Sequence, residues 1–340
     1  MRIIINAYNI RAGGSKVMLL DLLSSAIKIN NIRCIVYIDP RFDRTSFKTN
    51  HNIEFIPTPI SQRLFVDLRI KKQSKPHDII IYLGNLPPMI RHNNKVILSQ
   101  SNRYLVENYP ISGFPFISKF RITMERLLFK YFRKNADWII VQSLVMKDLL
   151  LKMGISKDVA KVMPFKNKDC IDLKDIEKIE NSFLYVASGE PHKNHMNLVH
   201  AWALLAEECI QPILFLTLDK KMPVYQKVSD YIKRNKLNIT FLEDIPREEL
   251  FIYYQKVKAL IYPSYFEAYG LPLIEAKDFG LPILASELDY VRDLLDPDQT
   301  FDPSSPRSIS RAVKRFLNKN DRSYSVLTGD AFIKEISTWI

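Results

Sequence analysis

The sequence contains no apolar run long enough to cross a membrane. Its apolar stretches have the length of β-strands, whereas a membrane-spanning helix needs about 20 consecutive apolar residues. The first residues, MRIIINAYN, form a strand-like run that Asn6 and Asn9 interrupt too early for a secretory signal. We therefore expect neither a membrane span nor a signal peptide.

Cysteine and histidine are also scarce. The three cysteines, Cys34, Cys170 and Cys209, have neither the spacing of metal ligands nor the even number of a disulfide framework, which suits a reducing cytoplasm. The six histidines show no H-E-x-x-H motif, so a catalytic zinc is not expected. The D-P-D sequence at residues 296–298 is typical of a turn. We expect a cytoplasmic protein that needs no metal and no other cofactor.

Positive charge is what the chain has in excess. Its 49 lysines and arginines outnumber its 37 aspartates and glutamates, and the net charge is +12. Such an excess favours an anionic partner, which can be nucleic acid, a membrane surface or a phosphorylated substrate. The sequence has no recognisable motif for reading DNA or RNA. A basic nucleic-acid-binding protein is therefore a distant alternative, and we expect no nucleic acid partner.

The basic residues cluster in one amphipathic segment, residues 115–135. Bulky apolar residues alternate there with six basic residues and a single acid, Glu125. A helix of this composition can lie in the interface of an anionic membrane. It is equally typical of a long core helix with a solvated basic face. The basic residues are Lys119, Arg121, Arg126, Lys130, Arg133 and Lys134.

The chain alternates between strand and helix patterns almost throughout. Continuous apolar runs separated by helical patterns indicate parallel sheets covered on both faces, and so an α/β protein. A polar, charge-rich stretch at residues 166–181 interrupts the alternation, as an interdomain linker does. We predict an N-terminal domain over 1–165 and a C-terminal domain over 182–340. Each is predicted to be a Rossmann-like doubly wound domain, and the two face an interdomain cleft.

The most informative stretch is YPSYFEAYGLPLIEAKDFGLPILA, residues 262–285. Glu267 and Glu275, with seven residues between them, flank Gly270. An apolar strand runs into this segment and a helical pattern runs out of it. A carboxylate at a strand end followed by a glycine at a helix start suits a phosphorylated, hydroxyl-rich ligand. Carboxylates accept hydrogen bonds from adjacent sugar hydroxyls.

This segment closely resembles the signature of the retaining nucleotide-sugar glycosyltransferases of family 4, which have the two-domain GT-B fold. Weaker resemblance extends over nearly the whole chain. It implies that the domain over 1–165 binds the acceptor and that the domain over 182–340 binds the nucleotide sugar. It implies transfer of a hexose-type sugar from a nucleotide-diphosphate sugar to an acceptor hydroxyl, with UDP, GDP and dTDP donors all compatible. The matching residues are Glu267, Gly270, Leu271, Pro272, Glu275, Ala276, Gly280 and Pro282.

The resemblance implies roles for the residues around the glutamate pair. Glu267 is the candidate catalytic residue that contacts the donor sugar's hydroxyls beside the anomeric carbon. Glu275 is implied to hold the ribose hydroxyls of the nucleotide. The peptide N–H groups of Gly270 and Leu271 are implied to face the diphosphate or the sugar, and a helix start suits such an anion.

A second segment, ASGEPHKN at residues 187–194, follows a strand and precedes a helix. Lys193 matches a family lysine that neutralises the leaving diphosphate, and it is the second candidate catalytic residue. Ser188 stands where many relatives have an arginine. Arg103, which follows a strand of the first domain, is a candidate to supplement that charge.

The first domain contributes two further groups of candidate site residues, one for binding the donor and one on the acceptor or sugar side. Gly13 and Gly14, in a turn predicted after the first strand, let the backbone approach a ligand closely. Gln100 and Asn102 stand where many relatives have a histidine, and are polar candidates on the acceptor or sugar side. Amides do not titrate, so neither can be a general base. The resemblance implies instead that the departing phosphate oxygen takes the acceptor's proton, while the protein supplies positioning and charge stabilisation.

The leading hypothesis is thus a retaining glycosyltransferase of surface-polysaccharide or O-antigen biosynthesis. A sugar or lipid-linked oligosaccharide is the expected acceptor. Residues 115–135 could contact the anionic cytoplasmic face of the inner membrane. The alternative within the same fold is a GT-B enzyme with other chemistry, such as a sugar-nucleotide epimerase or a phosphorylase.

Overall fold

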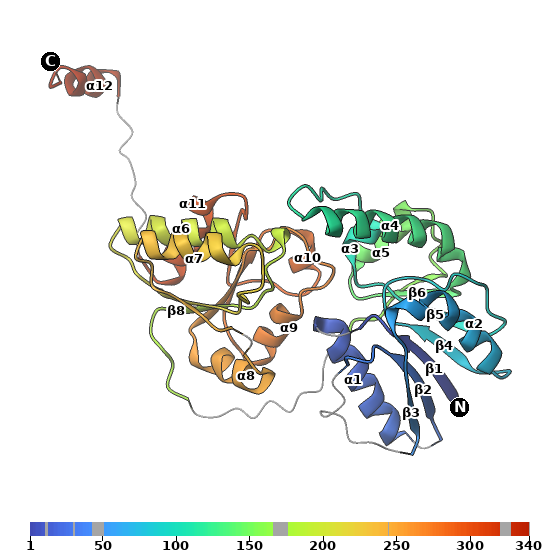
Figure 1. Ribbon diagram of the computed structural model, residues 1–340. Helices are drawn as coiled ribbons and strands as arrows, with labels where there is room; N and C mark the ends of the chain where they lie inside the picture. Colours follow the sequence, from blue (N-terminus) through green and yellow to red (C-terminus); the bar gives the residue numbers. More distant parts are fainter. Residues whose placement is uncertain are drawn as a thin grey trace.

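The computed structural model describes residues 1–10, 13–29, 31–42, 51–165, 176–243, 245–319 and 328–339. Two parallel β-sheets, each packed with helices, form two lobes of the molecule (Figure 1). The first lobe is coloured blue to green and the second yellow to orange-red. The predicted α/β class with two doubly wound domains is confirmed by this architecture.

The N-terminal sheet has, within the described ranges, seven parallel strands in the order β3-β2-β1-β4-β5-β6-β7. Its strands are β1 (Arg2–Ala7), β2 (Arg33–Ile38), β3 (Ile53–Pro57), β4 (Ile79–Tyr82), β5 (Lys95–Ser99), β6 (Trp138–Val141) and β7 (Ala160–Val162). The central strands are buried on both faces, which explains their continuous apolar runs. The helices of this lobe are α1 (Gly13–Lys28), α2 (Arg63–Gln73), α3 (Arg103–Val106), α4 (Phe116–Phe132) and α5 (Leu144–Lys152), with 3₁₀ turns at Ile60–Gln62 and Arg133–Asn135.

The C-terminal sheet has, in the part of the chain that is described, six parallel strands in the order β10-β9-β8-β11-β12-β13. Its strands are β8 (Ser182–Tyr185), β9 (Ile213–Leu216), β10 (Ile239–Phe241), β11 (Ala259–Tyr262), β12 (Ile283–Ser286) and β13 (Gln299–Phe301). A 3₁₀ turn, η3 (Pro191–Lys193), follows β8. The helices of this lobe are α6 (His195–Glu207), α7 (Tyr225–Arg234), α8 (Arg247–Lys256), α9 (Leu271–Asp278), α10 (Asp289–Arg292) and α11 (Pro306–Phe316). Helix α12 (Gly329–Ile336) has no buried residue and lies apart from the lobe in Figure 1.

Both sheets reverse their strand order beside their first strand. The reversal lies between β1 and β4 in one sheet and between β8 and β11 in the other. Loops that leave the carboxyl ends of such neighbouring strands diverge and open a crevice, where ligands of α/β proteins bind. In the C-terminal lobe these two loops carry Lys193 and Glu267, the two candidate catalytic residues.

Three details differ from the sequence-based expectation. The predicted glycine turn at residues 12–15 is wrong in part, because α1 already begins at Gly13, whereas residues 11 and 12 lie outside the described residues. The apolar run at residues 183–187 predicts a strand up to Ala187, whereas β8 ends at Tyr185. Strand β7 was not predicted, because three residues are too few to show a period.

Of the predicted linker 166–181, residues 166–175 lie outside the described residues, so the domain boundaries stay a prediction.

Candidate functional site

The two candidate catalytic residues form an ion pair. The Lys193 ammonium nitrogen lies 2.7 Å from Oε1 of Glu267, although 74 positions separate the two residues in the sequence. Their side chains are only 14% and 10% exposed, so the pair is largely withdrawn from water. The hydrogen bonding of β8 to β11 brings their loops together. The structure therefore unites two residues that the sequence placed in separate motifs.

Two buried tyrosines at the ends of the strands hold this pair. Tyr262, the last residue of β11, donates a hydrogen bond of 3.0 Å to Oε1 of Glu267. Tyr185, the last residue of β8, donates to the backbone carbonyl of Lys193 at 2.5 Å. Both tyrosines are almost completely buried. Sequence reasoning missed them, since a tyrosine that ends an apolar strand looks like any other core residue.

The ion pair sets the charge of Glu267. Burial by itself raises the pKa of the Glu267 carboxyl, but the Lys193 ammonium offsets this effect and the pKa lies below its ordinary value. At the neighbouring His192, burial disfavours the charged imidazolium and so lowers the pKa to about 4. Near neutral pH the site thus holds the ionised Glu267 carboxylate and a neutral His192 imidazole beside Lys193.

Helix α9 starts beside Glu267 on a glycine with a special backbone. Gly270 has φ of 90° and caps the helix, a conformation that residues with a Cβ rarely adopt. The first N–H groups of a helix have no partner inside it and can bind an anion. The predicted anion-binding groups at Gly270 and Leu271 therefore lie directly after the Glu267 loop.

Glu275 has partners of its own. Its Oε1 accepts a 2.7 Å hydrogen bond from Nη2 of Arg247, and its Oε2 accepts one of 2.9 Å from the Tyr254 hydroxyl. Both partners lie on α8, seven positions apart and so on one face of that helix. The two glutamates therefore bond to separate side chains. The spacing of Arg247 and Tyr254 by two helical turns was visible in the sequence. That spacing does not show that the two residues bond to Glu275, because this depends on the packing of α8 against α9.

The loop after β8 is tied to the loop after β11. Asn194 adopts the left-handed conformation, with φ of 62°, and its amide donates to the carbonyls of Pro263 and Pro303 at 3.0 and 2.7 Å. Ser188, at the place of the family arginine, is exposed and donates a hydrogen bond to the carboxylate of Glu190. The Ser188 hydroxyl is therefore already engaged within its own loop.

The predicted glycine element of the first lobe meets the second lobe. A Cβ at Gly14 would lie 2.9 Å from Cδ1 of Leu271, so the start of α1 packs closely on the start of α9. The starts of these helices also lie side by side in Figure 1. Gly13 and Gly14 belong to the first turn of α1, and the absent side chain at Gly14 permits the approach.

The predicted polar residues after β5 shape a turn. Gln100 is buried, its amide donates to the carbonyl of Asn85 at 3.0 Å, and its oxygen accepts from the Asn102 N–H at 2.9 Å. Asn102 caps α3 by accepting from the Tyr104 N–H at 3.1 Å. The Arg103 guanidinium donates to the backbone carbonyl of Glu267. Of these three candidates, Arg103 is thus the one that bonds to the Glu267 loop.

In the described ranges, no group of three or more His, Cys, Asp or Glu side chains lies close enough to hold a metal ion. The two aspartates of the D-P-D sequence are separately engaged. Asp296 pairs with Arg292 at 2.8 Å, and Asp298 accepts from the Ile283 N–H at 2.8 Å. None of the helices described has both the length and the hydropathy that a membrane crossing requires.

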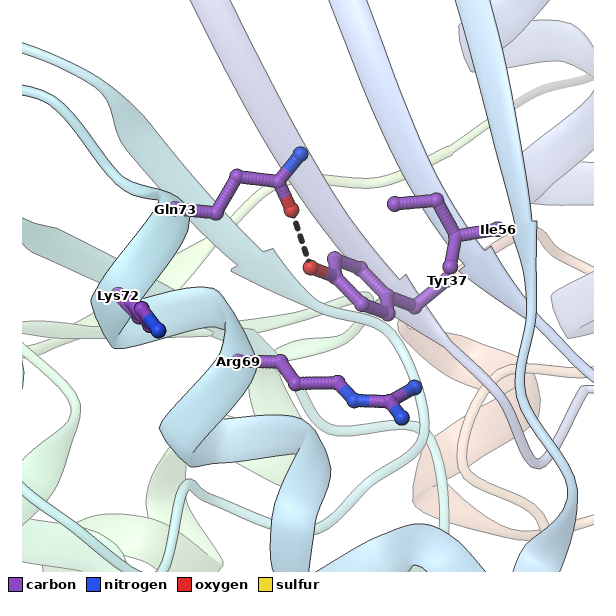
Figure 2. A pocket seen from close by; sticks show the side chains of 5 residues that line it. All are labelled: Tyr37, Ile56, Arg69, Lys72 and Gln73. Carbon is purple, nitrogen blue, oxygen red and sulfur yellow. Dashed lines mark hydrogen bonds between the residues drawn. The ribbon is translucent and has the colours of Figure 1, made fainter.

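A shallow cavity of about 260 Å³ lies elsewhere in the first lobe (Figure 2). Figure 2 shows Arg69 of α2 beside the ring of Tyr37, whose hydroxyl donates to Gln73, whereas Lys72 on the same helix lies farther from that ring. The remaining lining residue is Ile56 of β3. This cavity contains none of the residues predicted for the site. We place the site at the strand-end loops, because the charged and helix-start groups converge there.

Two facing Rossmann-like lobes of this topology form the GT-B architecture of glycosyltransferases. The sucrose-phosphate synthase of Thermosynechococcus elongatus has a TM-score of 0.70 at 18% identity, over 94% of this chain and 90% of that one. HepE of Anabaena, solved with UDP and glucose, has a TM-score of 0.68 at 15% identity, over 93% of this chain and 90% of that one. Similarity at this level of identity concerns the fold.

A sequence comparison then matches the C-terminal part of the chain to a family. Residues 172–327 match the family described as glycosyl transferases group 1, so this part of the chain is a domain of that family. The O-antigen chain mannosyltransferase RfbU of Salmonella typhimurium is 28% identical over 192 residues, which are 56% of this chain and 53% of that protein. The O-antigen chain mannosyltransferase B of Escherichia coli is 26% identical over 158 residues, 45% of this chain and 42% of that protein. The chain thus spans about half the length, or less, of these curated relatives.

Proposed function

We propose that the protein is a retaining glycosyltransferase that transfers a hexose-type sugar from a nucleotide-diphosphate sugar to an acceptor hydroxyl. The buried Lys193–Glu267 pair carries this proposal. It places an anion for sugar hydroxyls and a cation for a diphosphate next to each other, directly before the N-terminus of α9. The family match of residues 172–327 supports the same reaction class.

In the proposed mechanism, Glu267 accepts hydrogen bonds from the donor sugar's hydroxyls. Lys193 and the first N–H groups of α9 neutralise the charge that develops on the leaving diphosphate. The bond between the anomeric carbon and the diphosphate oxygen breaks, and the acceptor oxygen bonds to that carbon on the same face. The departing phosphate oxygen takes the acceptor's proton, so no protein base is needed. Glu275 holds the ribose.

Mannose is the proposed sugar, and O-antigen or another surface polysaccharide is the proposed product. The support is that the curated relatives described above are O-antigen chain mannosyltransferases. A lipid-linked oligosaccharide is the proposed acceptor. We place the reaction at the cytoplasmic face of the inner membrane, without a metal or other cofactor.

Stabilisation by donors tests the proposal. We expect UDP-, GDP- and dTDP-mannose to differ in the thermal shift they cause, since one base fits the site. The matching donor at 100 times its Kd raises the free energy of unfolding by about 2.7 kcal/mol. Incubation with that donor and a lipid-linked oligosaccharide then yields a mannosylated product with the anomeric configuration of the donor, read by NMR. An inverted product contradicts retention, and conversion of the donor without an acceptor indicates the epimerase or phosphorylase alternative.

Helix α4 provides the proposed membrane contact. Its inner side is held by buried Ile122 and Phe129 and by Arg126, which donates to the carbonyls of Tyr104 and Tyr109 at 2.6 and 2.9 Å. Its apolar outer stripe is exposed, and Lys119, Arg121, Lys130 and Lys134 accompany it. The stripe consists of Phe116, Ile117, Phe120, Met124, Leu127 and Tyr131, which are 41% to 82% exposed. An exposed apolar stripe flanked by cations favours the membrane interpretation over the core-helix one.

Vesicle binding tests this contact. A variant with Ile117→Ser, Phe120→Ser and Leu127→Ser is expected to lose at least about tenfold in affinity for vesicles of anionic phospholipid, since each buried large apolar side chain is worth roughly 1.5–3 kcal/mol. The matched control is Phe65→Ser with Leu68→Ser, which removes exposed apolar side chains from α2. Sedimentation with the vesicles measures the affinity. Equal binding of the α4 variant and the wild type would contradict the contact.

A further inference from the structure

The backbone of the Glu267 loop is bonded to the opposite lobe. Nη1 of Arg103 donates to the carbonyl oxygen of Glu267 at 3.2 Å, and the Ser143 hydroxyl donates to the carbonyl oxygen of Ala268 at 2.9 Å. Two consecutive peptide groups of the C-terminal lobe are therefore held by two side chains of the N-terminal lobe. Arg103 and Ser143 follow neighbouring strands, β5 and β6, at the same edge of their sheet.

Arg103 is itself held in place from several sides. Its Nε donates to a carboxylate oxygen of Glu107 at 2.6 Å, one helical turn away. Its guanidinium carbon lies 4.5 Å from the ring centroid of Phe266, the residue before Glu267. The Arg103 side chain is 16% exposed. A planar guanidinium fixed by a carboxylate and a ring presents its remaining N–H groups in one direction, here toward the Glu267 carbonyl.

The Ser143 hydroxyl is likewise held by two hydrogen bonds. It is buried, and its hydroxyl oxygen accepts from the Met146 N–H at 3.3 Å as the cap of α5. The same hydroxyl donates its proton to Ala268. The Val145 N–H in the first turn of α5 donates to Asp293 of the other lobe at 2.8 Å. The start of α5 is thus docked on the C-terminal lobe at two points.

An aromatic contact joins the same lobes beside Arg103. The Tyr104 hydroxyl lies 3.1 Å from Nδ1 of His192, and the Tyr104 ring lies 4.6 Å from that of Phe266, centroid to centroid. Tyr104 therefore touches both the loop that carries Lys193 and the loop that carries Glu267. The N-terminal lobe therefore contacts both loops that carry the Lys193–Glu267 pair, through α3 and the start of α5.

We propose that Arg103 and Ser143 are positioning residues, which set the backbone of Glu267 so that the donor-sugar site is complete only when the two lobes are docked. This inference rests on the proposed glycosyl transfer. The two described partners of Glu275, Arg247 and Tyr254, by contrast both lie in the C-terminal lobe. The nucleotide part of the donor thus binds to one lobe, whereas the sugar part depends on both.

Replacement of either residue is therefore expected to separate turnover from nucleotide binding. In Arg103→Ala and in Ser143→Ala, kcat falls by about ten- to hundredfold, since a misplacement of about 1 Å costs up to about 10² in rate. UDP, GDP and dTDP are first compared by the thermal shift that each causes in the wild type. The Kd of the nucleoside diphosphate with the largest thermal shift is then expected to stay within about twofold of the wild-type value in both variants. Arg103→Lys keeps the charge and one donor, and so recovers part of kcat.

Two control variants match the changes chemically. Arg91 also bridges a carbonyl and a carboxylate in the N-terminal lobe, those of Lys134 and Asp137 at 2.7 and 3.0 Å, without contact to the Glu267 loop. Ser305 is likewise a helix-capping serine, at the start of α11. Arg91→Ala and Ser305→Ala are expected to keep wild-type kcat. A fall in kcat equal to that of the Arg103 and Ser143 variants would overturn the proposal.

Hydrogen exchange separates this inference from the proposed function. Amides of residues 266–270 are expected to exchange roughly fivefold faster, or more, in Arg103→Ala and Ser143→Ala, because the loop loses an anchor. Unchanged exchange in both variants overturns the positioning role, and so does a loss of nucleotide affinity that parallels the loss of kcat. A wild-type protein that transfers no sugar refutes the glycosyl transfer, while the exchange data still decide whether Arg103 and Ser143 hold the loop.

Discussion

Glu267→Gln is expected to reduce sugar transfer by a factor of about 10² or more while the protein stays folded. The glutamine keeps the size of the side chain but removes the charge that strengthens hydrogen bonds to the sugar hydroxyls. A hydrogen bond to a charged group is worth about 1.5–3 kcal/mol, and two such bonds correspond to at least about 10² in rate. The measurement is kcat with the matching donor, together with the Kd of the nucleoside diphosphate, which is expected to be nearly unchanged.

The control for this variant is Glu287→Gln. Glu287 is also a paired glutamate of the C-terminal lobe, but its partner Arg292 lies on the surface and neither belongs to the site. The Glu287→Gln variant is expected to transfer sugar at the wild-type rate. If Glu267→Gln transfers sugar at the wild-type rate, Glu267 does not contact the reacting sugar, and the assignment of the site is wrong.

Lys193→Met is expected to impair stability as well as transfer. Removing one member of a buried ion pair leaves the other as an uncompensated charge and typically costs about 3–5 kcal/mol. Both side chains are at most 14% exposed, so solvent screens this pair little. Transfer is lost too, because the leaving diphosphate loses its cation. In the double variant Lys193→Met with Glu267→Met, stability is expected to return toward wild type while transfer stays abolished.

The pH dependence of this destabilisation has a definite sign. In the wild type the folded-state pKa of Glu267 lies below its ordinary value of 4.5, so the carboxylate contributes stability above pH 4.5 that is lost as the pH falls through the folded-state pKa. Without Lys193, burial is the largest remaining effect and raises that pKa above 4.5. The variant then loses stability as the pH rises through the new pKa. The difference between wild type and variant is therefore small in acid and largest near neutral pH.

Urea unfolding at pH 4 and at pH 7.5 measures this difference. Lys220→Met is the matched control, because Lys220 also pairs with a glutamate, Glu243 at 2.6 Å, but its side chain is 68% exposed. A surface pair contributes little to stability, so this control is expected to unfold like wild type at both pH values. A pH-independent difference for Lys193→Met would show that Glu267 does not titrate as the structure indicates.

Much of the fold and part of the site could be predicted from the sequence. The apolar runs identified the central strands of both sheets, since strands buried on both faces need apolar residues at every position, whereas the short edge strand β7 was missed. Gly270 was predicted at a helix start, and the structure has it as the residue that caps α9, with φ of 90°. The family signature predicted a glycosyltransferase domain, and the match of residues 172–327 confirms it. The catalytic and binding roles of individual residues stay predictions.

The contacts between the lobes were not predictable. Arg103 was a candidate to supplement the charge at the diphosphate, but its contacts with Glu107, Phe266 and the Glu267 carbonyl were not foreseen. Arg103 and Glu267 are 164 positions apart in the sequence, and no pattern among neighbouring residues predicts a contact over such a separation. The exposed face of α4 is a similar case. Its period was visible in the sequence, but which of its faces the lobe buries depends on the elements that pack against it.

The sequence alone determined the elements of this protein and the chemical groups at their ends, because apolar period, helix start and glycine conformation are properties of neighbouring residues. The tertiary structure decided which of those groups meet. The pairing of β8 with β11 joined Lys193 to Glu267, the packing of α8 on α9 joined Arg247 to Glu275, and the docking of the lobes joined Arg103 to the Glu267 loop. Such contacts depend on strand order and on the burial of whole surfaces, which are set by the complete chain.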